Sequence, residues 1–119
     1  MNHSKHRFTI NQHFDGKEEI VRKSYDELLR ILRSRGPVTE SAKKSSIHLV
    51  NTTTLAGVAT RKNYLILTLK SDHELENPRI RKSERVSLHC FHLKLKISSP
   101  DDVNEELKGW LNHAYSLSA

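Results

Sequence analysis

Apolar residues recur at intervals of three and four in two stretches of the chain, and the first stretch lies between Asp15 and Pro37. Asp15 is suited to cap the first turn of a helix, and Glu18 follows three residues later, as in a capping box. Gly36 and Pro37 favour a helix end, because Gly adopts the left-handed terminal conformation and Pro cannot continue the helix. The pattern predicts an amphipathic helix with one buried face, formed by Val21, Tyr25, Leu28, Leu29 and Leu32.

The second stretch with helical spacing closes the chain. Ser99 can cap its first amides, Pro100 suits the first helical position, and Asp102 stands three residues after the cap. Acidic residues gather in the first two turns, where they complement the positive end of the helix dipole. The apolar face of this predicted helix consists of Val103, Leu107, Trp110, Leu111 and Ala114, so the single Trp is expected in the core.

Between these two helices the apolar residues alternate with polar ones, which is typical of strands with one buried face. The predicted strands are residues 46–49, 55–60 and 64–70, followed by a last strand that ends at Ile97. Phe91 to Ile97 alternate with one parity, whereas Val86, Leu88 and Cys90 have the other, which predicts a bulge or chain break near residues 90–91. Residues 72–77 are expected to form a loop, and the basic segment 78–85 gives no clear pattern.

This element order predicts an α+β fold, a two-layer sandwich with a mainly antiparallel sheet and the N-terminal and C-terminal helices packed on one face. Residues 1–13 are polar and are expected to form a flexible arm, with residues 14–119 as a single domain. The apolar faces predict one shared core that includes Val21, Leu28, Leu65, Leu67, Leu69, Leu93, Leu95, Leu107 and Trp110.

Length and composition fit one soluble domain. The chain has 119 residues, of which 35% are hydrophobic, and it carries neither a long apolar run nor an apolar N-terminal stretch. A cytoplasmic location is therefore expected. Cys90 is the single cysteine, so one chain cannot build a disulfide or a multi-cysteine zinc site.

Charge points to an anionic partner. Twenty Lys and Arg residues exceed fourteen Asp and Glu residues, which gives a formal net charge of +6. If the helices cover the leucine-rich face, the opposite face exposes basic side chains suited to nucleic acid or another polyanion, although an ordinary solvated sheet face explains the same pattern. The candidate anion-binding residues are Arg79, Arg81, Lys82, Arg85, Lys94 and Lys96.

The sequence gives no indication of catalysis. His89 and His92 are the closest pair of strand histidines, but an offset of three places them on opposite faces of a regular strand. The acids and the Lys within residues 100–108 fall in one helix, whereas a metal-dependent nuclease needs them on strands around a metal. Cys90 and His92 are likewise unsuited to act as a nucleophile pair. A non-enzyme without catalytic residues, metal site or cofactor is expected.

Several features occur together along almost the whole chain, from about Phe14 to Tyr115. They are Phe14 before a helix that contains Tyr25, Ile47 in the first strand, Arg61-Lys62 before Tyr64-Leu65-Ile66-Leu67, Arg79 after a proline, and Asp102-Val103-Asn104-Glu105-Glu106-Leu107 followed by Trp110-Leu111 and Ala114-Tyr115. This combination resembles domain-of-unknown-function family 5655. The resemblance implies a small bacterial domain with a compact helix-and-sheet fold. Some domains of this kind are labelled predicted transport proteins and others are attached to predicted nucleases, so a nuclease is implied as a candidate partner.

The function predicted from these observations is that of a non-catalytic accessory binding module that contacts nucleic acid or another polyanion. One alternative is a protein-interaction or self-association module, which would show a conspicuous exposed apolar patch. Another is a small-ligand binding domain, which would show a cavity with convergent polar groups.

Overall fold

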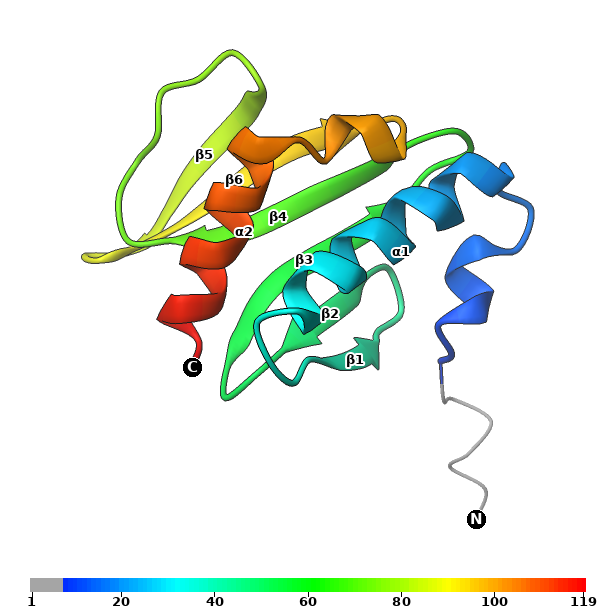
Figure 1. Cartoon of the computed structure of the whole chain (residues 1–119), viewed down its shortest axis with the longest axis horizontal. Coiled ribbons are helices and arrows are strands. Elements are labelled where there is room, and N and C mark those ends of the chain that lie inside the picture. The colour runs from blue at the N-terminus through cyan, green and yellow to red at the C-terminus, as the bar shows by residue number, and fades with distance from the viewer. Residues whose placement is uncertain (1–7) are drawn as a thin grey trace.

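The computed structural model describes residues 8–119, which form two layers (Figure 1). Helices α1 (Glu19–Arg33) and α2 (Glu105–Leu117) lie side by side on one face of a six-stranded sheet. Two short 3₁₀ turns precede them, η2 (Asn11–Phe14) and η3 (Pro100–Asp102). The predicted α+β sandwich with both helices on one face is confirmed. No described helix has the length and apolar character needed to span a membrane.

The sheet is antiparallel throughout, with the strand order β1-β2-β3-β4-β6-β5. Its strands are β1 (Thr39–Ala42), β2 (Ile47–Val50), β3 (Thr54–Thr60), β4 (Leu65–Ser71), β5 (Ile80–Ser87) and β6 (Cys90–Ile97). After β4 the chain passes over to the outer edge, forms β5, and returns as β6 between β4 and β5. The last two strands therefore make a hairpin whose inner strand completes the sheet.

One face of the sheet and the two helices share a single core. Leu65, Leu67 and Leu69 of β4 are at most 1% exposed, and register pairing sets Leu67 against Val58 on one side and Leu95 on the other. Val21 and Leu28 of α1 and Leu107 of α2 form the helical side of this core. The predicted core is confirmed with two corrections: Leu93 is buried but lies outside the cluster that the other residues form, and Trp110 is only partly buried and packs at the margin of the core. A side chain at this edge of the apolar stripe covers the core without entering it.

The start of α1 differs from the prediction. The helix begins at Glu19, and Asp15 instead follows η2 in an extended conformation without capping the helix. A turn through Gly16, whose φ is +74°, separates η2 from the helix. Of the arm expected over residues 1–13, residues 1–7 lie outside the described part of the chain. Ile10 and Phe14 pack against the core, so ordered structure begins before residue 14.

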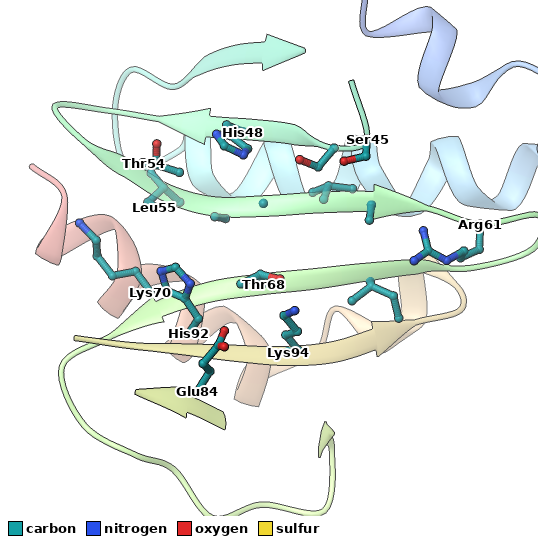
Figure 2. Close-up of a pocket in the computed structure, with 16 residues that line it drawn as sticks. Ser45, His48, Thr54, Leu55, Arg61, Thr68, Lys70, Glu84, His92 and Lys94 are labelled. Atoms are coloured by element: carbon teal, nitrogen blue, oxygen red, sulfur yellow. The ribbon is translucent and has the colours of Figure 1, made fainter. Parts of the chain in front are cut away.

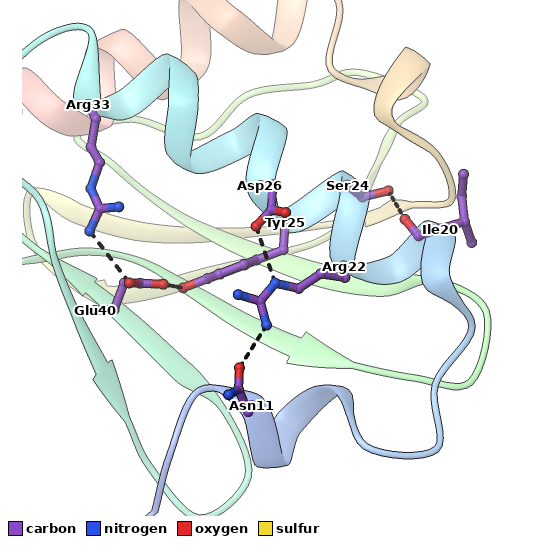
Figure 3. A network of polar contacts seen from close by, with 8 residues as sticks. All are labelled: Asn11, Ile20, Arg22, Ser24, Tyr25, Asp26, Arg33 and Glu40. Atoms are coloured by element: carbon purple, nitrogen blue, oxygen red, sulfur yellow. Dashed lines mark hydrogen bonds and ion pairs between the residues drawn. The ribbon is translucent and has the colours of Figure 1, made fainter.

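Polar contacts attach α1 to its neighbours (Figure 3). The hydroxyl of Tyr25 donates to the Glu40 carboxylate of β1 at 2.6 Å, and Arg33 pairs with the same carboxylate at 3.5 Å. Burial of the Tyr25 phenol, together with its bond to Glu40, raises the pKa of Tyr25. Arg22 donates to Asn11 of η2 at 3.1 Å and to Asp26 at 3.3 Å. The bonds to Glu40 and Asn11 join β1, which is an edge strand, and η2 to the helix.

The C-terminal helix also begins later in the sequence than predicted. The Asp102 carboxylate accepts hydrogen bonds from the amides of Ser98 and Ser99. This capping box stands at the start of η3 and not at the start of α2. The α-helix begins at Glu105, where Asn104 is the N-cap and its side chain accepts from the amide of Leu107 at 3.1 Å. The Ser99 motif therefore forms a separate turn ahead of α2.

Two strands were missing from the prediction. β1 is short and polar, and β5 is the basic segment that lacked a clear pattern; both are edge strands. The change of parity near residue 90 is a hairpin turn at Leu88 and His89 between β5 and β6, where a bulge or break was predicted. An edge strand pairs with another strand on one side only and commonly carries charged or polar residues. It therefore lacks the continuous apolar face of a central strand.

Candidate functional site

The face of the sheet opposite the helices carries the alternate residues of the strands, and Figure 2 views it with the helices behind. Register pairing aligns one row of side chains across five strands, formed by His48, Gly57, Thr68, Lys94 and Lys82. We call this side of the sheet the open face. Because strand residues alternate, each leucine that enters the core is followed by a residue on the open face.

The open face contains a hollow of about 610 Å³. Its floor is low because Gly57 and Ala59 of β3 have little or no side chain; a Cβ added to Gly57 would approach no heavy atom outside its chain neighbours closer than 4.0 Å. Polar side chains surround this floor, including His48, Thr68 and His92 (Figure 2). The hollow is thus a shallow, polar-walled surface that can accommodate a ligand of extended shape.

Positive charge predominates in the hollow. Arg61, Lys70 and Lys94 line it together with one acid, Glu84, which is the register partner of His92. The ammonium of Lys70 donates to the hydroxyl of Thr53 at 2.8 Å and is held at the end of β4. With neutral histidines, these lining residues carry more positive than negative charge.

A second depression, of about 430 Å³, lies beside the C-terminal end of β6. It is lined by Pro78, Arg79, Arg81 and Lys96. The ammonium of Lys96 lies 4.5 Å from the centre of the Tyr64 ring, a cation–π arrangement that leaves the Lys side chain exposed. Among residues 8–119, three cations and no acid line this depression.

A bulge between Ile80 and Lys82 explains how β5 contributes to both depressions. A bulge disrupts strict alternation, so consecutive residues can face the same side. Lys82 is paired with Lys94, while Arg81 lines the depression that contains Lys96. We call these four side chains, Arg81, Lys82, Lys94 and Lys96, the basic block. Within residues 8–119, none of the four has a hydrogen bond or ion pair through its side chain.

The other two predicted anion-binding residues have internal partners. Arg79 donates to the carbonyl of Asp102 at 2.7 Å and to the side chain of Asn104 at 3.0 Å, and it pairs with Glu106 at 3.7 Å. Arg85 donates to the carbonyls of Ser87 and Leu88 at the hairpin turn. Arg79 therefore links β5 to the start of α2, and Arg85 supports the hairpin.

A separate cluster of titratable groups lies beyond the end of β4. One oxygen of Asp72 is 2.7 Å from Nδ1 of His73 and 2.9 Å from Nε2 of His113 in α2. Hydrogen bonds from these imidazoles lower the pKa of the Asp72 carboxyl to about 2. No sequence pattern indicates this cluster, because 41 residues separate Asp72 from His113. His89 lies in the hairpin turn and His92 on the open face, and neither belongs to the cluster.

Comparison with known proteins identifies one family model, described as a domain of unknown function (DUF5655), which matches residues 10–118. The match includes both helices and all six strands. Neither the curated proteins nor the solved structures gave a match.

Proposed function

The chain belongs to the DUF5655 family, and we propose that it is a non-catalytic accessory domain that binds nucleic acid through the basic block and the adjoining hollow of the open face. The observation that carries this proposal is the pairing of Lys82 with Lys94 in the sheet register. Like charges directly opposite each other destabilise a sheet. A bound phosphate would relieve that repulsion.

The arrangement of the block suits a chain of phosphates better than a single anion. Lys94 and Lys96 are two residues apart on β6, or about 7 Å along a strand. Arg81 and Lys82 lie across from them on β5, so the four cations form a compact group open to solvent. Such a group recognises backbone charge and displaces counterions without reading bases.

The hollow beside the block offers room for the rest of a nucleotide. Its low floor at Gly57 and Ala59 leaves space for a base, and the hydroxyl of Thr68 and the rings of His48 and His92 offer hydrogen-bonding groups. We therefore favour single-stranded nucleic acid, whose bases are free to turn toward the sheet. A cytoplasmic location and a nuclease partner go with this proposal.

A salt titration tests it. Fluorescence anisotropy of a labelled single-stranded oligonucleotide, DNA and RNA in turn, is measured with the wild type and with Lys94→Gln/Lys96→Gln. Each phosphate contact contributes about 0.7 to the slope of log affinity against log salt for single strands. The double variant is expected to lower this slope by about 1.4 and to weaken binding at low salt.

A matched variant controls for net charge. Lys23→Gln/Lys108→Gln removes two charges from the helical layer and is expected to keep the wild-type slope within error. Equal losses in the two double variants would show that only net charge matters and would refute a site on the open face. Absence of binding to either oligonucleotide at low salt would refute nucleic acid as the ligand.

A small anionic ligand is the second candidate, and the hollow itself favours it. Its volume of about 610 Å³ falls within the range of small-molecule sites. Gly57→Leu would fill the floor of the hollow while leaving the basic block intact. If a mononucleotide binds the wild type and this substitution abolishes that binding but leaves oligonucleotide affinity unchanged, the hollow is a small-ligand site.

A further inference from the structure

The cluster beyond β4 brings two imidazoles and a carboxylate together from distant parts of the chain. Asp72 and His73 directly follow the last residue of β4, and His113 belongs to α2. The three potential ligand atoms all lie within 4.8 Å of one another. We propose that Asp72, His73 and His113 bind one divalent transition-metal ion of the zinc type, which links the end of β4 to α2.

The direction of the ring nitrogens supports this assignment. Nδ1 of His73 and Nε2 of His113 both point at the same carboxylate oxygen, at 2.7 Å and 2.9 Å. A nitrogen lone pair occupies the direction that an N–H bond would take, so a cation near this point faces both rings. Zinc–nitrogen bonds are about 2.0–2.1 Å long. Modest closing of the rings and a rotation of the Asp72 side chain therefore produce three bonds.

The spacing of the rings fits as well. Their centres are 5.7 Å apart and their planes are tilted by 56°, so the rings are not stacked. Two imidazoles bound to one tetrahedral zinc ion have ring centres about 5 Å apart, as follows from the bond lengths and the tetrahedral angle. The observed separation is close to this value.

The backbone holds two of the ligands in place. The hydroxyl of Ser71, a residue only 2% exposed, donates to the carbonyl of His73 at 2.7 Å and accepts from its amide at 3.3 Å. This closed turn fixes the chain at Asp72 and His73, while α2 fixes His113. Support of this kind around the ligands is a common feature of metal sites. The Asp72, His73 and His113 side chains are 47%, 57% and 40% exposed, so water can complete the coordination.

The ligand types select the metal. Imidazole and carboxylate suit zinc, iron, nickel and copper, whereas calcium and magnesium prefer oxygen ligands. Three protein ligands with one open position leave the ion accessible to solvent. The site lies on another part of the molecule from the basic block, and its occupation is independent of the proposed function.

Calorimetric titration with zinc chloride tests the proposal on the full chain without a histidine tag. The wild type is compared with His113→Gln and Asp72→Asn, and His89→Gln serves as the matched control because it removes an exposed imidazole from the hairpin turn. The variant His3→Gln/His6→Gln measures how much zinc binds to histidines outside the proposed site. The two site variants are expected to bind zinc at least about tenfold more weakly. Both controls are expected to retain the wild-type affinity at the principal site.

Cobalt provides a second measurement, since its visible absorption reports the ligands directly. Bands that appear with the wild type and His89→Gln should be lost in His113→Gln and in Asp72→Asn. Circular dichroism checks that each variant is folded, which the exposure of these side chains favours. Wild-type protein that binds neither metal, or site variants that bind as well as the wild type, would overturn the proposal.

Discussion

The two faces of the sheet are built from the same strands but have opposite compositions. On β4, Leu65, Leu67 and Leu69 enter the core, while Ile66, Thr68 and Lys70 lie on the open face. On β6, Leu93, Leu95 and Ile97 are buried, while His92, Lys94 and Lys96 lie on the other side. Adjacent residues of one strand therefore have different roles in this account: the buried residues stabilise the fold, and we propose the residues of the open face for binding.

This division explains why the two faces should respond differently to mutation. The covered face gains its stability from apolar area removed from water. The open face retains partly exposed side chains and places Lys82 against Lys94, which costs stability. Substitutions on the covered face are therefore expected to change unfolding, and substitutions on the open face are expected to change binding.

The largest effect is expected from neighbours on β4. Leu67→Ala removes a fully buried side chain and should lower the free energy of unfolding by about 2–5 kcal/mol. Thr68→Ala, one residue further, should change it by less than about 1 kcal/mol. Urea denaturation of both variants measures the contrast. Equal losses would show that the open face is packed as the covered face is.

A close contact within the helical layer gives the next effect. The φ of Gly36 is +157°, and a Cβ there would come within 2.3 Å of the Tyr115 hydroxyl. Gly36→Ala should therefore cost about 1–3 kcal/mol, because both the backbone and the contact resist it. Gly109→Ala on α2 meets nothing within 4 Å and should stabilise the helix by about 0.5–1 kcal/mol. Thermal unfolding of the two variants should shift in opposite directions.

Arg79 and Lys94, which were both predicted to bind anions, should differ in their contribution to stability. Arg79→Ala breaks its bonds to Asp102 and Asn104 and should cost about 1.5 kcal/mol of stability. Lys94→Ala should leave the stability unchanged or slightly higher and should reduce the salt dependence of oligonucleotide binding. Denaturation and anisotropy are measured on both proteins. A Lys94 variant as unstable as the Arg79 variant would assign Lys94 a structural role.

Adjacent small residues on β3 offer a weaker test. Gly57 lies on the open face and has room for a methyl group, so Gly57→Ala should raise the free energy of unfolding by about 0.5–1 kcal/mol. Ala56 is 3% exposed in the core, and Ala56→Val should lower it by about 1–3 kcal/mol through overpacking. Denaturant midpoints compare the two. Stabilisation by Ala56→Val would reveal unfilled space beneath the helices.

The smallest effect concerns acid stability at Asp72. Its pKa is about 2 in the folded protein and 3.8 ordinarily, so the ionised form stabilises the fold above pH 3.8. That contribution is lost as the pH falls from 3.8 through about 2. Melting temperatures of wild type and Asp72→Asn should differ at pH 5 and converge near pH 2. Asp101→Asn, which removes an equal charge at an exposed position, should not reproduce this convergence.

The covered face was predictable from sequence because burial imposes a pattern. Alternating apolar residues identified β2, β4 and β6, β3 was predicted as the strand between β2 and β4, and the helical stripes identified α1 and α2. The edge strands were missed for a physical reason: β1 and β5 bury little, so their residues are free to be polar. The boundary at Asn104 was missed because Ser99 offers an equally good capping signal five residues earlier.

The candidate site was predictable in part. Lys94 and Lys96 follow from alternation on β6, but the inclusion of Arg81 with Lys82 depends on a bulge that no sequence pattern indicated. The internal bonds of Arg79 and the contact of Asp72 with His113 arise from tertiary packing across 23 or more residues. Local patterns contain no information on such meetings.

Methyl NMR on the protein with a single-stranded oligonucleotide tests the division between the faces most directly. At low salt, the methyl signals of Ala59, Ile66 and Thr68 are expected to shift on titration, while those of Leu67, Leu69 and Leu95 stay in place. The first set lies on one face of β3 and β4 and the second on the other face of β4 and β6, so local unfolding of these paired strands would shift both sets of signals. Shifts confined to the buried leucines or to the helices, or no shift in any methyl signal, would refute binding at the open face.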